Sequence, residues 1–294
     1  MELKIQESIY KNRSHASCLK TAYETLLSNL WPVFKYVWPF ALFYAFCAMM
    51  NGVLNTSLRV DAFQNIVNID TIVMTVVCLL LTIVADIMLT ARIFTMLNKE
   101  KLLRTTWRYV KSQLTILFVV FLLSAAITAI IYAIVGNEFA PTPRNFIYLY
   151  GYVMVLTLII SLFSLPYAYG FMRYMSEREC GVVDIIGKDY INGVRYYGFI
   201  FIVMLLSAIL LGIVFFVIAM PSFVISTAEL LSDMGKAMLG DQPGLPSYFK
   251  AMQVVTYALT GFLMMFLRVY FILVIYYMYG TITERIRIKK EMKG

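Results

Sequence analysis

The chain has 294 residues, of which 61% are hydrophobic and only 14% are charged, and its net charge is +8. Soluble domains carry about 25% charged residues, so the composition excludes an ordinary soluble protein and predicts a chain built mainly of membrane spans. The basic residues gather at the ends of apolar runs, without the spacing of a zinc finger or the aromatic pattern of an RNA-binding domain. We therefore expect membrane lipids, and not nucleic acid, as the partners of these charges.

Six apolar runs follow one another along the chain, and each reaches the length of about 20 residues that crosses a bilayer as a helix. Residues 1–18 are polar and do not resemble a cleavable signal peptide, so the first run is expected to stay in the mature protein. Pro166 predicts a kink in the fourth span. The spans are predicted at approximately 33–54, 69–97, 114–136, 146–175, 198–220 and 252–279, with outer loops at 55–68, 137–145 and 222–250, the last containing a short helix in STAELLSDMGKAML.

The distribution of Lys and Arg predicts the orientation of these spans. Twenty of these residues flank the ends that we assign to the cytoplasm, and four lie in the outer loops. By the positive-inside rule both termini are cytoplasmic, and we expect a multi-pass protein of a bacterial inner membrane. The three tryptophans lie near span ends and are predicted to anchor the helices at the membrane interface: Trp31, Trp38 and Trp107.

An amphipathic segment precedes each odd-numbered span, at 19–30, 101–113 and 182–197, and each is predicted to lie as a helix in the interface. Under a shift of 83 residues the tripeptide LSA at 123–125 aligns with LSA at 206–208. The shared order of elements predicts three repeated units of an interfacial helix and a helical hairpin. The units cover approximately 19–97, 101–175 and 182–280, followed by a basic cytoplasmic tail at 281–294, in one all-α transmembrane domain.

The segments LLRTTWRYVKSQ and VVDIIGKDYINGVRYY, each placed before a span, are similar to segments of a broad group of bacterial proteins. In its whole span pattern the chain resembles stand-alone six-span integral membrane proteins of bacteria. It also resembles the membrane domain that is fused to some glycerophosphodiester phosphodiesterases. The phosphodiesterase catalytic domain is absent, so the resemblance implies an integral membrane protein with no catalytic residues to carry over.

Two charged residues lie well inside predicted spans, Asp86 in the second and Arg268 in the sixth. Each lies 11 residues before the last apolar residue of its span, which is roughly 16 Å from the inner end and close to the middle of the bilayer. Ser164 in the fourth span falls at a similar depth. A lone charge at this depth costs about 3 kcal/mol, so a structural ion pair is expected. A second possibility is a polar site, lined by all three residues, for an anionic or proton-coupled substrate, and a third is that the residues face different cavities and never meet.

Motifs for enzyme chemistry are missing from the sequence, which has no HExxH, no GxSxG and no phosphate-binding GxxxxGK[ST]. We therefore expect no catalytic residue, no bound metal and no cofactor. The single histidine, His15, is predicted to lie in a solvated loop. Cysteines 18 and 180 are expected as reduced cytoplasmic thiols, and cysteines 47 and 78 as small packing residues within spans.

Two classes of function remain. The first is a non-catalytic membrane component that binds lipid, a partner membrane protein or a second copy of itself. The second is a small transporter or channel with a polar site at Asp86 and Arg268. Few polar residues line the spans, and a water-filled route needs more of them, so the sequence favours the first class.

Overall fold

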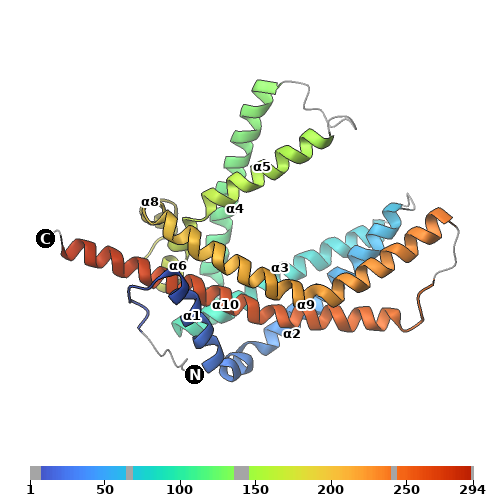
Figure 1. The fold of residues 1–294 in the computed structure, drawn as a ribbon, viewed down its shortest axis with the longest axis horizontal. Coiled ribbons are helices and arrows are strands. Elements are labelled where there is room, and N and C mark those ends of the chain that lie inside the picture. Colours follow the sequence, from blue (N-terminus) through green and yellow to red (C-terminus); the bar gives the residue numbers. More distant parts are fainter. Residues whose placement is uncertain (1–7, 64–68, 136–145, 240–243, 293–294) are drawn as a thin grey trace. The chain divides into compact units, whose positions relative to one another are not determined.

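The computed structural model describes residues 8–63, 69–135, 146–239 and 244–292, and every regular element in these ranges is a helix (Figure 1). Five of the described helices are long and apolar enough to cross a membrane, or six spans if one bent pair counts as a single span. The prediction of an all-α fold with several helices able to span a membrane is confirmed, and the count of six spans stays a prediction. The helices are α1 (His15–Ser28), α2 (Leu30–Phe63), α3 (Ile69–Asn98), α4 (Leu102–Val135), α5 (Phe146–Ser164), α6 (Tyr167–Ser176), α7 (Val182–Ile186), α8 (Lys188–Arg195), α9 (Tyr197–Leu239) and α10 (Phe249–Glu291).

The helices belong to two compact units, and α9 and α10 each contribute to both. Unit 1 consists chiefly of Leu19–Thr106 and Leu206–Val274, and so holds α2, α3 and most of α9. Unit 2 consists of Ile9–Cys18, Trp107–Leu205 and Ile275–Gly294, and so holds α5 to α8 and the end of α10. The predicted single domain over residues 1–294 and the threefold repeat stay predictions.

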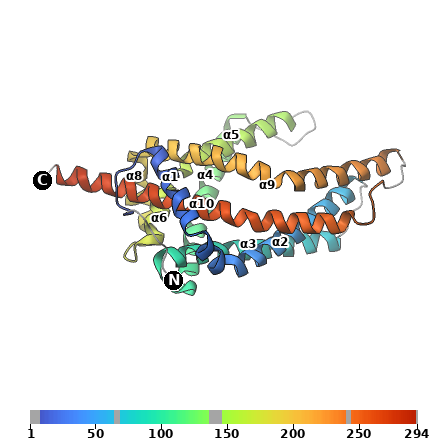
Figure 2. The same ribbon diagram turned by 60° about the horizontal axis from the view of Figure 1, so that its bottom comes forward.

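Unit 1 is built from long apolar helices that pack along their lengths. The helices α2 and α3 lie side by side as a hairpin (Figure 1). Polar pairs join α9 to α10, which run next to each other in Figure 2: Ser222 Oγ lies 2.7 Å from Thr260 Oγ1, and Gln253 donates a hydrogen bond to Glu229. A Cβ on Gly261 of α10 would lie 3.1 Å from the Cα of Ala45 in α2, so the missing side chain lets these two helices approach closely.

Several helices extend beyond the predicted spans. The predicted outer loop at 55–68 is wrong in its first part, because α2 continues to Phe63. The segment STAELLSDMGKAML at 226–239 is helical as predicted, but it is the last part of α9, which runs without a break to Leu239 and contains Pro221. Spanning helices tolerate proline because neighbouring groups satisfy the freed carbonyl, and residues 53–63 contain neither glycine nor proline to stop α2. The predicted loop at 137–145 lies outside the described residues.

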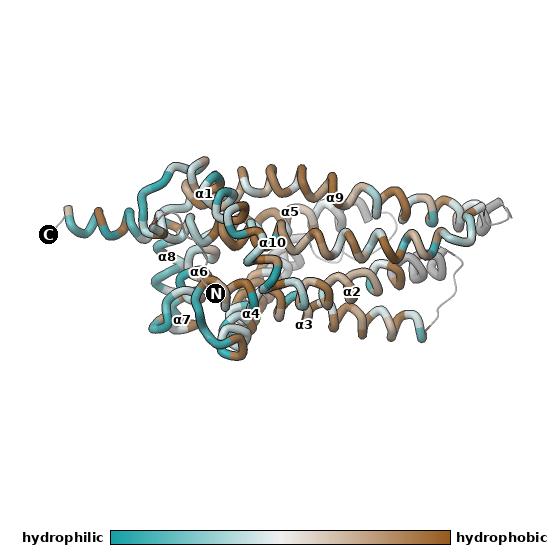
Figure 3. Tube along the Cα trace, turned by 90° about the horizontal axis from the view of Figure 1, so that it is seen from below, coloured by the Kyte–Doolittle hydropathy of each residue, from teal (hydrophilic) through white to brown (hydrophobic). Residues whose placement is uncertain are grey.

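Unit 2 contains a bend and a cluster of short helices. The chain bends by 46° between α5 and α6, at the position of Pro166. After α6, the predicted interfacial helix at 182–197 is instead two short helices, α7 and α8, which meet at Gly187. The helix α8 and the end of α10 are largely hydrophilic in Figure 3, in contrast to the apolar spanning helices. By comparison, α4 is one continuous helix that includes both the amphipathic segment at 101–113 and the span after it.

The end of α10, which contains most of the predicted basic tail at 281–294, forms part of the core of unit 2. Thr281 and Ile282 are completely buried. A Cβ at Gly280 would clash with the backbone of Ile9, so the N-terminal segment lies directly against α10. Arg285 fixes this contact by donating to Asn12 Oδ1 and to the Arg13 carbonyl, both at 2.9 Å.

His15 is likewise not a loop residue. It is the first residue of α1, and its ring centroid lies 4.8 Å from that of Phe199 in unit 2. The segment before α1 therefore ends at Ser14, and Arg285 of α10 holds it through Asn12 and the Arg13 carbonyl.

Candidate functional site

The two charges predicted within the membrane lie together in unit 1. The guanidinium of Arg268 in α10 faces the carboxylate of Asp86 in α3, with Nη1 donating to Oδ1 and Nη2 donating to Oδ2 at 2.8 Å. This two-point geometry is the strongest form of an arginine–carboxylate contact. The helix faces that carry the pair are packed, since Leu89 and Val269 next to it are completely buried. The pair therefore joins α3 to α10.

The ion pair is only partly covered by protein. The side chain of Asp86 is 25% exposed and that of Arg268 is 33% exposed. At mid-bilayer depth an exposed charge is costly unless it is neutralised, and here each charge directs its hydrogen bonds at the other. The arrangement gives a neutral, partly exposed contact between two helices, in which the guanidinium and the carboxylate are directed at each other.

Ser164, the third residue predicted for this polar site, belongs to unit 2. Its hydroxyl donates to the Ser161 carbonyl at 2.8 Å, within its own helix. It lies at the last position of α5, directly before the bend at Pro166. The predicted site shared by Ser164 with Asp86 and Arg268 stays a prediction.

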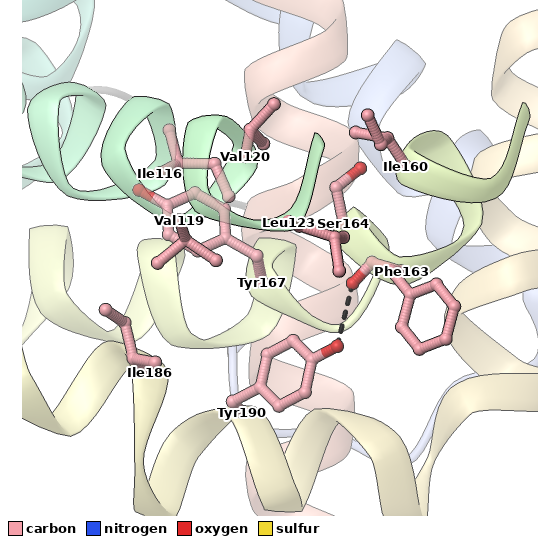
Figure 4. Close-up of a pocket in the computed structure, with 10 residues that line it drawn as sticks. All are labelled: Ile116, Val119, Val120, Leu123, Ile160, Phe163, Ser164, Tyr167, Ile186 and Tyr190. Atoms are coloured by element: carbon pink, nitrogen blue, oxygen red, sulfur yellow. Dashed lines mark hydrogen bonds between the residues drawn. The ribbon is translucent and has the colours of Figure 1, made fainter. Parts of the chain in front are cut away.

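The bend at Pro166 frees backbone carbonyls at the end of α5, and tyrosines from the following helices satisfy them. Tyr190 of α8 donates its hydroxyl hydrogen to the Phe163 carbonyl at 2.8 Å (Figure 4), and Tyr197 at the start of α9 donates to the Leu162 carbonyl at 3.4 Å. Irregular backbone within a membrane requires such partners, because lipid offers none. The bend in unit 2 is therefore stabilised by specific hydrogen bonds from these two tyrosines.

A pocket lies beside this bend, with a volume of about 270 Å³. Figure 4 shows its lining, which comes from α4, α5, α6 and the two short helices. The side chains are mostly aliphatic and aromatic, and the polar ones are Ser164 and the hydroxyls of two tyrosines. The lining residues are Ile116, Val119, Val120, Leu123, Ile160, Phe163, Ser164, Tyr167, Ile186 and Tyr190.

A polar cluster in unit 2 holds the short helices in place. Arg173 of α6 donates to Glu177 Oε2 at 3.0 Å and to Asp189 Oδ1 at 2.5 Å. Tyr279 of α10 donates to Glu177 Oε1 at 2.5 Å, so one arginine and two carboxylates tie together α6, α8 and the end of α10. The Arg108 guanidinium of α4 adds to this, donating to the Glu177 carbonyl at 2.6 Å where α6 ends.

Burial acts in different ways on the two carboxyl groups of this cluster. Burial raises the pKa of Asp189, whose side chain is completely buried, and Arg173 opposes that effect. Burial also favours a higher pKa for Glu177, but the hydrogen bonds from Tyr279 and Arg173 outweigh it, so the net pKa of Glu177 is lowered. Burial raises the pKa of the adjacent Cys180 thiol to about 11, so this thiol stays protonated at neutral pH.

Two glycines allow the close packing of this region. A Cβ at Gly193 in α8 would clash with the backbone carbonyl of Pro166, and one at Gly170 in α6 would lie 2.9 Å from the Ile185 carbonyl oxygen. Sequence reasoning assigned the charges here to the positive-inside pattern and missed their pairing. The glycines at 170, 187 and 193, which lie among polar residues, are the feature of the sequence that could have predicted closely packed short helices here.

The predicted interface anchors all present their rings outward. Trp31 is 70% exposed, Trp38 is 42% exposed and Trp107 is 60% exposed. The Lys111 ammonium lies 5.3 Å from the ring centroid of Trp107, one helical turn along α4. Such exposed aromatic rings near basic side chains suit the headgroup level of a membrane.

Comparison with protein-family models, with curated proteins and with solved structures found no match.

Proposed function

We propose that the chain is a non-catalytic integral membrane protein of the bacterial inner membrane, with both termini in the cytoplasm, that binds membrane lipid. The long apolar helices support the membrane assignment, and the excess of Lys and Arg at one set of span ends supports the orientation. The observation that carries the proposal is the two-point ion pair of Asp86 and Arg268. A transport site requires charges that face a substrate, and these two charges face each other.

The alternative function, a small transporter or channel, predicts a different behaviour of the same residues. In that case the ion pair opens during the transport cycle, and the charges take part in binding or in proton transfer. In the proposed function their role is to hold α3 against α10, and an apolar pair at the two positions is an adequate substitute.

Flux measurements on proteoliposomes that contain the purified full chain test this proposal. Proton flux is followed with a pH-sensitive dye, and potassium and chloride fluxes with ion-sensitive dyes, under an imposed membrane potential. We expect rates equal to those of empty liposomes for the wild-type chain. A flux that the wild-type chain supports and that Asp86→Asn or Arg268→Gln abolishes would establish the transporter instead.

A further inference from the structure

The pocket beside the bend is formed by one face of α4 and the helices opposite it. The α4 residues that line it are 116, 119, 120 and 123, which recur at the spacing of a single helical face. The residues between them point away and are strongly exposed: Leu117 is 63% exposed, Phe118 is 62% exposed and Phe121 is 65% exposed. One face of α4 therefore lines the pocket, and the opposite face meets the lipid.

The polar groups in the lining already have partners. Tyr167 donates to the Ser112 carbonyl at 2.7 Å, Tyr190 donates to Phe163, and Ser164 donates to Ser161. Each hydroxyl hydrogen is used within the protein, so the pocket presents no free donor to the carbonyl or phosphate oxygens of a ligand. The rest of the pocket surface is aliphatic and aromatic, so a ligand is held there by apolar contacts and not by hydrogen bonds.

The surroundings of the pocket select the occupant. The pocket lies on helices that the proposed function places in a membrane, where acyl chains are the apolar groups present at high local concentration. A dry apolar cavity takes up an apolar guest readily, and mass action favours the most abundant guest. Its volume of about 270 Å³ is below the usual range for drug-sized ligands, so it suits part of a flexible chain better than a bulky ring system.

We propose that this pocket binds an acyl chain of a membrane lipid that enters from the cytoplasmic leaflet. The inference rests on the proposed function and names its ligand. The side of entry follows from the short helices α7 and α8, which carry the basic residues Lys188 and Arg195 and lie at the predicted cytoplasmic end. Lys188 is exposed and lies in the chain between two lining residues, Ile186 and Tyr190, so a cation is present in the segment that forms this end of the pocket.

Two variants at one position change the pocket in opposite directions. Leu123→Trp fills it, and Leu123→Ala enlarges it. The matched control is Phe118→Trp, which adds the same ring to the lipid-facing side of the same helix and leaves the lining intact. The probe is a phosphatidylglycerol with a diazirine in one acyl chain, incorporated at low fraction in vesicles with the full chain. Photolabelled residues are then identified by peptide mass spectrometry.

The expected result is saturable labelling within residues 116–123 and 160–167 that unlabelled phosphatidylglycerol displaces. We expect this labelling to fall at least fivefold in Leu123→Trp and to be unchanged in Phe118→Trp. Labelling that does not saturate, or that is equal in the two tryptophan variants, would overturn the proposal, because it would reflect general contact with bulk lipid.

A second probe, a fatty acid with the same diazirine, identifies the source of the chain. If the fatty acid probe labels the pocket saturably and the phosphatidylglycerol probe does not, the ligand is a free fatty acid. If both probes label it saturably, the pocket recognises the acyl chain and not the headgroup. Should Leu123→Trp be too unstable to purify, displaceable labelling of wild type and its change in Leu123→Ala decide the question. Loss of the pocket proposal leaves the flux results unaffected, so the failures of the two proposals are distinguishable.

Discussion

Arg268 contacts both carboxylate oxygens of Asp86 across 182 positions of sequence, and this pair joins α3 to α10 inside unit 1. Both side chains are partly exposed, at 33% and 25%, which means that the pair faces the surroundings of the bundle as a neutral unit. Within a membrane, neutrality of the pair matters more than its net attraction, since a single charge left behind has no water to solvate it.

The ion pair predicts an unequal effect of single and double substitution. Arg268→Leu alone leaves Asp86 uncompensated, and we expect a loss of about 3 kcal/mol or more in folding stability. Asp86→Leu combined with Arg268→Leu removes both charges, and we expect stability within about 1 kcal/mol of wild type. The measurement is unfolding in mixed micelles followed by tryptophan fluorescence. A double variant as unstable as Arg268→Leu would show that the charges do more than neutralise each other.

Close packing at the bend predicts a strict requirement for glycine at position 193. Gly193→Ala places a methyl group against the Pro166 carbonyl, so α8 must move away from the bend. We expect a loss of about 1–3 kcal/mol, the usual cost of overpacking, measured as a lower melting temperature of the purified protein. The control is Gly198→Ala in α9, where a Cβ meets no atom within 4 Å, and which is expected to be neutral or slightly stabilising. Equal effects of the two would contradict the packing described for the bend.

The hydroxyl of Tyr190 is expected to stabilise the bend. Tyr190→Phe removes the donor to the Phe163 carbonyl, which lies at the exposed surface of the protein, where lipid offers no other donor. An acceptor without a partner there costs about 1–3 kcal/mol, or nearer 0.6 kcal/mol if other groups compensate as in other membrane proteins. The comparison is Tyr23→Phe in α1, a tyrosine that is 53% exposed. Thermal unfolding that is unchanged by Tyr190→Phe would indicate that the carbonyl finds another partner.

The lowered pKa of Glu177 predicts a pH dependence of stability. A carboxyl group whose pKa is lower in the folded state binds protons less readily there than in the unfolded chain. It therefore stabilises the fold above its unfolded pKa of about 4.3, and this contribution is lost as the pH falls through the lowered pKa. Glu177→Gln should be less stable than wild type at pH 6, and the difference should shrink below about pH 4.3.

This comparison isolates Glu177 from its neighbours. Arg173, Tyr279 and Cys180 lie beside the side chain of residue 177 in both the wild type and Glu177→Gln, and Asp189, whose pKa is raised by burial, is present in both. Melting temperatures from pH 3.5 to 7 measure the effect. A constant difference between the two proteins across this range would contradict the assignment of the stabilisation to the ionised carboxyl.

The sequence predicts those parts of the fold that depend on apolar runs. Spans are readable because lipid requires about 20 consecutive apolar residues, and the depth of Asp86 and Arg268 follows from counting residues along their runs. The ends of helices cannot be predicted from the sequence in the same way. Residues 55–63 of α2 are polar enough to suggest a loop, and Pro221 suggests an end to the fifth span, but residues 53–63 contain neither glycine nor proline and α9 accommodates Pro221.

The cluster around Arg173 was not predicted because its contacts depend on tertiary structure. Arg173 and Asp189 lie 16 positions apart on two different helices, and Tyr279 reaches Glu177 from a third helix far along the chain. In the sequence such charges cannot be told from the basic residues that set topology. The pocket was missed for a similar reason, since its lining comes from five helices that the sequence does not place together.

The most direct test of the proposed function is an experimental density map of the full chain in lipid nanodiscs, examined around Asp86 and Arg268. The proposed function predicts a direct two-point contact between the side chains, with lipid density against the bundle and no aqueous cavity that reaches the pair. A hydrated cavity open to one side of the membrane, or a non-protein molecule bound to the Arg268 guanidinium in place of Asp86, would contradict it and establish a substrate site.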